Sequence, residues 1–330
     1  MRSIRMAAVV LAAIAVATPA LALDETEANI HAIPGSLLIF PLFDANENHG
    51  TYITVTNTNA SGFSCLGRYV EGDICAHFTY INHDPTDEEC LEFDRYECLT
   101  PGDTITVDTA IHNPEHQQGW LWVEALDPGF LEPITFNHLI GSAIIVEADT
   151  DFAWSYTPYT FQSLVEADCN RTIACQTILR CVTDENTNGF ADFDGVEYPR
   201  FPDKVLIPLY FKEGEKRIEN ELTLMSVETD QSTPIAMRIF DDSETIFSRG
   251  TGFQCFLRGP LSDLASIVEL INGPDPERFE TGWISIDGGE GVLGVFRHER
   301  TTGQKTFTAG NELYVEGKET EPVKIRRFGR

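Results

Sequence analysis

Six oxygen-bearing positions between residues 184 and 194 are the strongest candidate for chemistry in this chain. Oxygen ligands at positions 1, 3, 5, 7 and 9 of a loop, with glycine at position 6, form the front of an EF-type calcium loop. Gly189 holds the glycine position, but Gly195 stands at the twelfth position, where that loop has an acidic ligand. Either Asp194 or Glu197 would have to supply the missing acidic contact. The predicted ligands are Asp184, Asn186, Asn188, Phe190 through its backbone carbonyl, Asp192 and Asp194.

A second interpretation of the same loop stays open. Asn188-Gly189 is a strong signal for a tight hairpin turn, and the carboxylates around it would then be solvated. The stretch resembles dockerin and thrombospondin-type calcium loops, although its ligand set falls short of the six or more oxygens that calcium takes. Calcium is the only cofactor that the sequence suggests.

Two tryptophans form the next candidate. Trp120 and Trp122 lie two residues apart in a strand-like segment, so their rings share one face. Such a pair can stack on a sugar or pack in a core. Because Trp283 matches Trp120 in a second copy of the surrounding sequence, we predict that this face is the inner one and that the rings pack in the core. The aromatics between residues 152 and 161 occur once and are the better candidates for a glycan or protein ligand.

Histidines and carboxylates give no recognisable catalytic motif. His112 and His116 bracket a turn without a third metal ligand, and His138 and His298 match each other as Phe-x-His, which predicts a buried structural role. The chain contains no Gly-x-Ser-x-Gly, no His-Glu-x-x-His and no phosphate-binding glycine loop. Carboxylates are abundant, so a secreted hydrolase that acts through them stays as an alternative.

The segments that hold these residues occur twice. Leu38–Phe43 is matched by Leu206–Phe211, and Gly119–Val123 by Gly282–Ile286, with nearly the same spacing. Two copies of one module set the domain boundaries. The predicted organisation is a signal peptide at 1–22, a first module at 23–150, a connector at 151–199 and a second module at 200–330.

Each copy consists of short strand-like segments, such as Leu37–Phe43, Trp120–Ala125 and Ile134–Leu139, separated by turn-forming stretches. About seven short strands in about 100 residues is typical of an immunoglobulin-like sandwich. We therefore predict an all-β fold of two immunoglobulin-like β-sandwich modules joined by a disulfide-containing connector. Pro41 and Pro208 lie inside strand-like segments, which predicts edge strands or bulges there.

The N-terminus predicts export. Arg2 and Arg5 precede an apolar run, and Ala20-Leu21-Ala22 is a small-residue cleavage site. The apolar run is shorter than the roughly 20 residues that a membrane span needs. We expect a secreted chain, extracellular or periplasmic, without membrane insertion.

Eight cysteines fit that compartment, because an even number in an exported chain indicates disulfides. Their spacing contains no Cys-x-x-Cys pair, which disfavours a metal site. The four in the first module can close on themselves in three ways, and Cys255 can pair with a connector cysteine and hold the halves together. The cysteines are Cys65, Cys75, Cys90, Cys98, Cys169, Cys175, Cys181 and Cys255.

The charge excludes some partners. The full chain carries a net charge of −29, and residues 23–150 hold 22 acidic residues against Arg68 and Arg95 alone. Such a surface repels nucleic acid and anionic lipid. The basic tail from Lys324 to Arg330 is the exception; it could dock on an acidic face of a neighbouring molecule, but a frayed terminus is the commoner outcome.

Four phrases resemble those of a group of uncharacterised secreted bacterial proteins with duplicated β-sandwich modules. They are Pro34–Pro41, Thr54–Asn59, Phe136–Gly141 and Asp192–Tyr198. The resemblance covers most of the mature chain and implies export and a β-rich build. It brings no activity with it.

The sequence favours an exported, non-catalytic structural or binding protein of the bacterial envelope or extracellular space. The alternatives are a carbohydrate-binding or adhesin-like module and the secreted hydrolase mentioned above. Self-association through sheet edges is a further expectation, because unpaired edge strands can add strands from another molecule.

Overall fold

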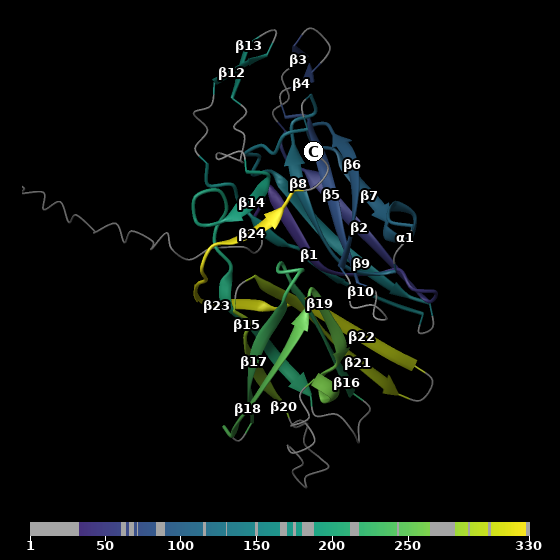
Figure 1. Cartoon of the computed structure of the whole chain (residues 1–330). Helices are drawn as coiled ribbons and strands as arrows, with labels where there is room; N and C mark the ends of the chain where they lie inside the picture. Colours follow the sequence, from purple (N-terminus) through teal and green to yellow (C-terminus); the bar gives the residue numbers. More distant parts are fainter. Residues whose placement is uncertain are drawn as a thin grey trace, which may run out of the picture.

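Strands dominate the computed structural model of the chain (Figure 1). The two helices in the part that it describes are a single turn each: α1 (Thr109–His112) and α2 (Leu261–Leu264). The described residues are 33–60, 64–65, 69–70, 72–83, 90–114, 117–129, 131–148, 151–165, 170–173, 176–179, 188–211, 218–242, 244–264, 281–289, 291–302 and 305–327.

The first half of the chain forms two antiparallel sheets. Sheet I has the strand order β11-β1-β8-β5-β6, and sheet II has the order β10-β9-β2-β7. The strands of sheet I are β1 (Leu37–Asp44), β5 (Ile74–His83), β6 (Cys90–Leu99), β8 (Gln118–Leu126) and β11 (Tyr159–Phe161). Those of sheet II are β2 (His49–Asn57), β7 (Thr104–Asp108), β9 (Leu139–Glu147) and β10 (Phe152–Tyr156).

The second half repeats this topology strand for strand. Sheet III has the order β18-β17-β20-β15-β23, and sheet IV has the order β19-β16-β21-β22. Sheet III consists of β15 (Pro202–Phe211), β17 (Ser232–Asp241), β18 (Ile246–Gln254), β20 (Thr281–Asp287) and β23 (Tyr314–Glu319). Sheet IV consists of β16 (Ile218–Ser226), β19 (Phe256–Pro260), β21 (Val292–Thr302) and β22 (Lys305–Glu312).

Three strand pairs complete the described part. β3 (Ser64–Cys65) pairs with β4 (Tyr69–Val70), and β12 (Asn170–Ile173) pairs with β13 (Gln176–Leu179). β14 (Phe190–Phe193) pairs with β24 (Val323–Arg326), so the connector and the C-terminal tail form one small sheet.

The all-β prediction is confirmed, but the prediction of two immunoglobulin-like sandwiches is wrong. The four larger sheets are arranged as the blades of a four-bladed β-propeller, with the small sheets added. In an immunoglobulin-like domain the first two strands share a sheet, whereas β1 and β2 lie in different sheets. Short alternating segments indicate how many strands a chain has, but not which strands pair, and this is why the sequence pattern misled.

A repeated Gly-Trp pair has a packing reason in both halves. A Cβ atom at Gly119 would collide with the backbone carbonyl of Ile81, and one at Gly282 would collide with that of Phe240. The neighbouring strand therefore approaches so closely that only glycine fits. This explains why the sequence Gly-Trp recurs at the start of β8 and β20.

The prolines in β1 and β15 mark bulges rather than sheet edges. The pairing of β1 with β8 shifts register between Phe40 and Phe43, and the pairing of β15 with β20 shifts between Ile207 and Tyr210. Each shift contains the proline, which cannot donate to the ladder. Both strands have a partner on either side, so of the two predicted alternatives the bulge is the correct one.

Sheet I buries both of its faces. Leu38 and Phe40 point towards sheet II, because both reach Gly141 of β9. Trp122 and Glu124 lie opposite Ile39 and Leu37 in β1 and so point the other way. We call this second side, which carries Trp120, Trp122 and Glu124, the outer face of sheet I.

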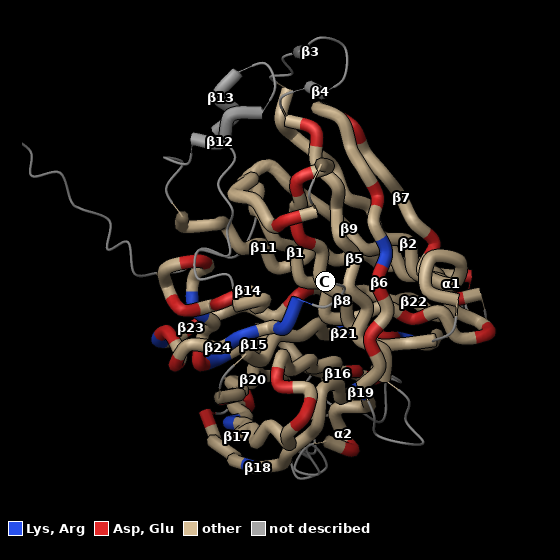
Figure 2. The backbone as a smooth tube through the Cα atoms, turned by 45° about the horizontal axis from the view of Figure 1, so that its top comes forward, with Lys and Arg blue, Asp and Glu red and all other residues tan. Residues whose placement is uncertain are grey.

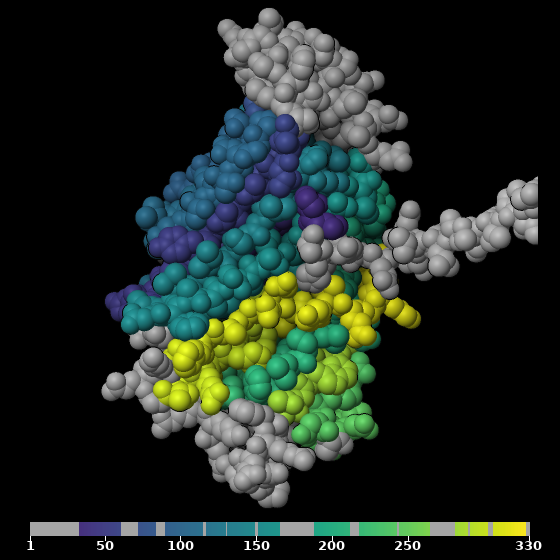
Figure 3. All heavy atoms as spheres, turned by 180° about the vertical axis from the view of Figure 1, so that it is seen from behind, coloured from purple at the N-terminus to yellow at the C-terminus, as the bar shows by residue number. Residues whose placement is uncertain are grey.

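Buried ion pairs and one disulfide join the two halves. Asp44 pairs with Arg258 at 2.5 Å, and Glu147 pairs with Arg297. Burial alone raises the pKa of Asp44, but the Arg258 guanidinium outweighs it and holds that pKa below its usual value. Figure 3 shows that the surfaces of β10 and β22 meet along this boundary. The halves therefore form one body.

None of the helices in the described residues is long and apolar enough to span a membrane.

We expect Gly119→Ala to lower the free energy of unfolding by about 2–4 kcal/mol, because the added methyl group must displace a backbone carbonyl. Urea unfolding followed by tryptophan fluorescence measures the change. Gly259→Ala is the matched control, since an added Cβ there meets nothing within 4 Å. A loss at Gly119 no larger than that of the control would contradict the close approach of β5 and β8.

Candidate functional site

The outer face of sheet I carries a group of buried and partly buried polar side chains. A sheet face buried on a core is normally apolar, and buried ionisable groups are found where they are paired or functional. Here the interior positions of three adjacent strands carry imidazole, hydroxyl, indole and carboxyl groups. They are His77 and Thr79 of β5, Glu92 and Asp94 of β6, and Trp122 and Glu124 of β8.

The end of the connector and the C-terminal strand cover part of this face. Phe161 of β11 packs against Phe193 and Phe201, with ring centroids 4.9 and 5.1 Å away. Beside them the Tyr198 hydroxyl donates to the Glu124 carboxylate at 3.0 Å. Figure 1 shows β14 and β24 beside β1 and β8. Residues 188–201 and 323–327 thus form a lid of residues from two distant parts of the chain.

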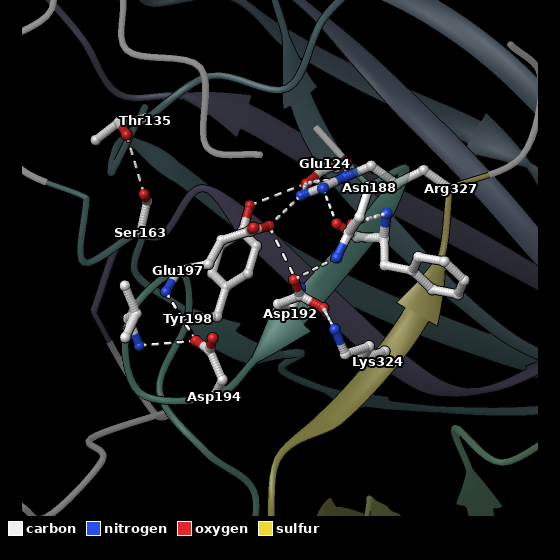
Figure 4. Close-up of polar contacts among 12 residues, drawn as sticks. Glu124, Thr135, Ser163, Asn188, Asp192, Asp194, Glu197, Tyr198, Lys324 and Arg327 are labelled. Carbon is white, nitrogen blue, oxygen red and sulfur yellow. Dashed lines mark hydrogen bonds and ion pairs between the residues drawn. The ribbon is translucent and has the colours of Figure 1, made fainter. Parts of the chain in front are cut away.

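Arg327 fixes this lid to the sheet (Figure 4). Its guanidinium binds the Glu124 carboxylate through two nitrogens, at 2.7 and 2.9 Å, and the Glu197 carboxylate at 2.5 Å. It also donates to the backbone carbonyl of Phe190. All three charged side chains are buried, with exposed fractions of 4% or less. One cation therefore joins the first sheet, the connector and the C-terminus.

The electrostatics of the cluster follow from one cation serving two carboxylates. Burial opposes the charge of Arg327, but Glu124 and Glu197 raise its pKa above the usual range. The pKa of Glu197 is raised to about 8, because burial and the neighbouring Glu124 raise it by more than Arg327 lowers it. Arg327 therefore keeps its charge, and its attraction opposes the rise in the pKa of Glu197 that burial causes.

The described part of the predicted calcium loop is bound within the chain. The Asp192 carboxylate accepts from the Asn188 amide at 2.8 Å and lies 3.1 Å from Lys324. The Asp194 carboxylate accepts from the backbone N–H groups of Val196 and Glu197. In the hairpin interpretation these carboxylates would be solvated, yet Asp192 is buried.

Calcium binding stays a prediction. Asp184 and Asn186 lie outside the described residues, and the carbonyl of Phe190 already accepts from Arg327. Among the residues that the structure describes, no group of three or more His, Cys, Asp or Glu is placed to hold a metal ion.

A second cluster lies on the same face, towards its edge. Asp94 accepts from His77 Nε2 at 2.8 Å and from the Thr79 hydroxyl at 3.0 Å, and it hydrogen-bonds to Glu92. Burial and the adjacent Asp94 raise the pKa of Glu92 to about 9. Burial alone raises the pKa of Asp94 as well, but the hydrogen bond from His77 holds it below its usual value. Two carboxyl groups with pKa values moved apart are what acid–base chemistry requires.

Two disulfides are described. Cys75 pairs with Cys98 inside sheet I, and Cys90 pairs with Cys255 across 165 residues. Cys255 thus holds the halves together as predicted, although its partner comes from the first module rather than from the connector. Cys169, Cys175, Cys181 and the side chain of Cys65 lie outside the described part of the chain. The disulfides are compatible with an extracellular location.

The tryptophans are buried, but not on the face that was predicted. Trp120 and Trp122 have no exposed surface, which confirms core packing. They lie on the outer face of sheet I, turned away from sheet II. Trp283, the counterpart of Trp120 in the second half, is 40% exposed and stacks on Phe240, with ring centroids 4.0 Å apart.

The aromatics of residues 152–161 are not the surface that the sequence suggested. β10 and β11 complete the sheets of the first half. Trp154, Tyr156, Tyr159 and Phe161 are buried, and the Tyr159 hydroxyl donates to the carbonyls of two residues in the second half. The prediction of a ligand surface is wrong for these four side chains, of which Trp154 and Tyr159 contact the second half.

The match between His138 and His298 is also wrong. His298 lies in the middle of β21, opposite Asn220, and burial lowers its pKa to about 4. His138 precedes β9 and is exposed. The shared Phe-x-His pattern is therefore a coincidence of composition. His112 lies in α1, and His116 lies outside the described residues.

Sequence reasoning missed Arg327 and Glu124 as partners. The basic tail was visible in the sequence, but the two predicted outcomes were docking on a neighbouring molecule and a frayed terminus, and neither places Arg327 inside its own chain. Figure 2 shows Lys and Arg gathered along β24 and β15, next to a first half in which Asp and Glu dominate. Docking occurs within the chain itself.

Comparisons with known proteins add no function. No family model matches the chain, and no curated protein matches it. One solved structure that matches is titled "Crystal Structure of Thermotoga maritima 1070". Its sequence is 12% identical to this chain, and the TM-score is 0.29. The aligned region covers 36% of this chain and 98% of that protein chain. A similarity at that level carries no argument about this chain.

We expect Arg327→Ala to lower the free energy of unfolding by about 3–5 kcal/mol, because it leaves a buried carboxylate without its partner. Arg238→Ala is the control, since Arg238 and Asp287 form an exposed ion pair that contributes about 1 kcal/mol or less. Urea denaturation at neutral pH measures both. Equal losses for the two variants would show that Arg327 does not anchor the lid.

Proposed function

We propose that this chain is an exported, non-catalytic structural or binding protein of the bacterial envelope or extracellular space. The observation that carries the proposal is how its buried charges are used. Asp44–Arg258, Glu147–Arg297 and Glu124–Arg327 each join segments far apart in the sequence. Together with Cys90–Cys255 they cross-link the two halves and the C-terminus. Such cross-linking suits a scaffold, whereas a catalytic group must direct a reactive atom at a substrate.

The Glu92–Asp94 pair is the strongest argument for the hydrolase alternative, and its contacts favour a structural role. Asp94 is already bound to His77, Thr79 and Glu92. A carboxylate with three internal partners has little capacity left to act as a base or nucleophile. The imidazole of His77 is itself buried and stacks on Tyr96, with ring centroids 4.4 Å apart.

A hydrolysis assay with wild-type protein and Glu92→Gln tests the non-catalytic proposal. We expect neither protein to release product above the blank from a broad panel of glycosides and esters between about pH 5 and 9. Turnover by the wild type that is lost in Glu92→Gln would establish the hydrolase instead. Retained folding of the variant is checked by near-UV circular dichroism.

Carbohydrate binding is the second candidate, and one surface favours it. Trp283, stacked on Phe240, is exposed on the side of sheet III that corresponds to the outer face of sheet I. On the same side lie the exposed Tyr314 and the ion pair between Arg238 and Asp287. A flat aromatic ring beside a fixed guanidinium and carboxylate offers a stacking surface and hydrogen-bonding groups for sugar hydroxyls.

A glycan array separates this candidate from a purely structural role. If the surface binds sugars, Trp283→Ala should reduce binding at least tenfold, because the stacking ring is gone. Tyr52→Ala is the matched control, since Tyr52 is 39% exposed on sheet II. Absence of any glycan signal for the wild type would remove the candidate and leave the structural proposal in place.

A further inference from the structure

A cavity of about 290 Å³ lies between β6, β7 and α1, away from both clusters described above. Its volume is at the lower end of the range of roughly 300–1,000 Å³ that is usual for ligand pockets, so it suits a small molecule. The lining residues are Arg95, Glu97, Val107, Asp108, Ile111 and His112.

Arg95 gives the cavity a cation in a fixed position. Its Nε donates to the backbone carbonyl of His112 at 3.1 Å, and the guanidinium lies 4.8 Å from the centre of the Phe93 ring. In the described part of the chain, its two terminal nitrogens donate to no protein group, although Glu97 and Asp108 line the same cavity. A guanidinium held in this way presents two parallel N–H groups, the geometry that binds a carboxylate.

His112 adds a second donor. The Tyr80 hydroxyl lies 2.7 Å from His112 Nδ1, and burial raises the pKa of Tyr80, so the hydroxyl keeps its proton and donates. Burial lowers the pKa of His112, and the neighbouring Glu97 opposes that shift. Because Nδ1 accepts from Tyr80, Nε2 is the ring nitrogen that can donate. Nε2 is buried and faces the Glu97 carboxylate, with an oxygen 3.5 Å away.

The remaining lining residues supply the opposite charge and an apolar wall. Glu97 and Asp108 are carboxylates, and one oxygen of Asp108 caps α1 by accepting from Ala110. Val107 forms part of the floor, and Ile111 is 76% exposed at the rim. The exposed Ile111 side chain therefore offers apolar surface beside the charged groups.

The second half shows that the architecture does not need these polar groups. In the second half, β17, β18, β19 and α2 correspond to β5, β6, β7 and α1. We align the halves by matching Ile81 with Phe240, because these residues lie opposite the equivalent tryptophans, Trp120 and Trp283. In this alignment Arg249 corresponds to Arg95, but four other polar residues in or next to the cavity correspond to uncharged residues of the second half. Tyr80, Glu97, Asp108 and His112 are matched by Ile239, Thr251, Pro260 and Leu264.

We propose that this cavity binds an aliphatic α-amino acid. Arg95 and His112 bind its carboxylate, Glu97 and Asp108 bind its ammonium group, and the alkyl chain packs on Val107 and Ile111. The acidic first half would repel a ligand with a net negative charge, which disfavours a simple carboxylate. This binding site goes beyond the function proposed above and does not depend on it.

Titration calorimetry with L-leucine tests the site, using two analogues that each lack one charge. Isocaproate lacks the ammonium group, and isoamylamine lacks the carboxylate. We expect L-leucine to bind and both analogues to bind at least tenfold more weakly, because each loses one ion pair. No binding of L-leucine up to about 10 mM, or an analogue that binds as well as L-leucine, overturns the proposal.

Variants assign the binding to this cavity. Arg95→Gln should weaken L-leucine binding at least tenfold, and Arg249→Gln, its counterpart in the second half, should leave it unchanged. His112→Leu copies the second half, so we expect it to fold and yet to bind more weakly. Unchanged affinity in both Arg95→Gln and His112→Leu contradicts the site.

Discussion

The buried guanidinium of Arg327 is the interaction on which the covered side of the molecule depends. Taking an arginine and two carboxylates out of water costs several kcal/mol for each ion, so such a cluster persists only when its geometry satisfies every group. Arg327 meets that condition through Glu124, Glu197 and the carbonyl of Phe190. Because these partners belong to a sheet strand and to the connector, the C-terminus cannot leave without exposing the outer face of sheet I.

The same device recurs between the halves. Arg258 and Arg297 both reach Glu221, and each also binds one acidic residue of the first half, Asp44 or Glu147. The first module has far more acidic than basic residues, so the cations that neutralise its buried carboxylates come from the second half and the tail. The charge asymmetry seen in the sequence is therefore a means of assembly as well as of solubility.

The sequence predicted the local features well and the pairing poorly. It predicted strands, a repeat and special backbone at Pro41 and Pro208, because these depend on residues close in the chain. It did not predict that most of the segment before β9, residues 133–138, is a loop with an isolated bridge at Pro133. It also did not predict that β10 and β11 belong to the first sheets. Which strands pair depends on contacts between distant residues, and a periodic pattern does not encode them.

The repeat shows where the two halves diverged. Trp120 is buried beneath a covered face, and its counterpart Trp283 is 40% exposed, although both follow a glycine that the sheet requires. The strand order is common to both halves, while the connector and tail cover the outer face of sheet I. Features that both halves share maintain the fold, so the open tryptophan of sheet III and the charged cavity beside α1 are differences that the fold itself does not demand.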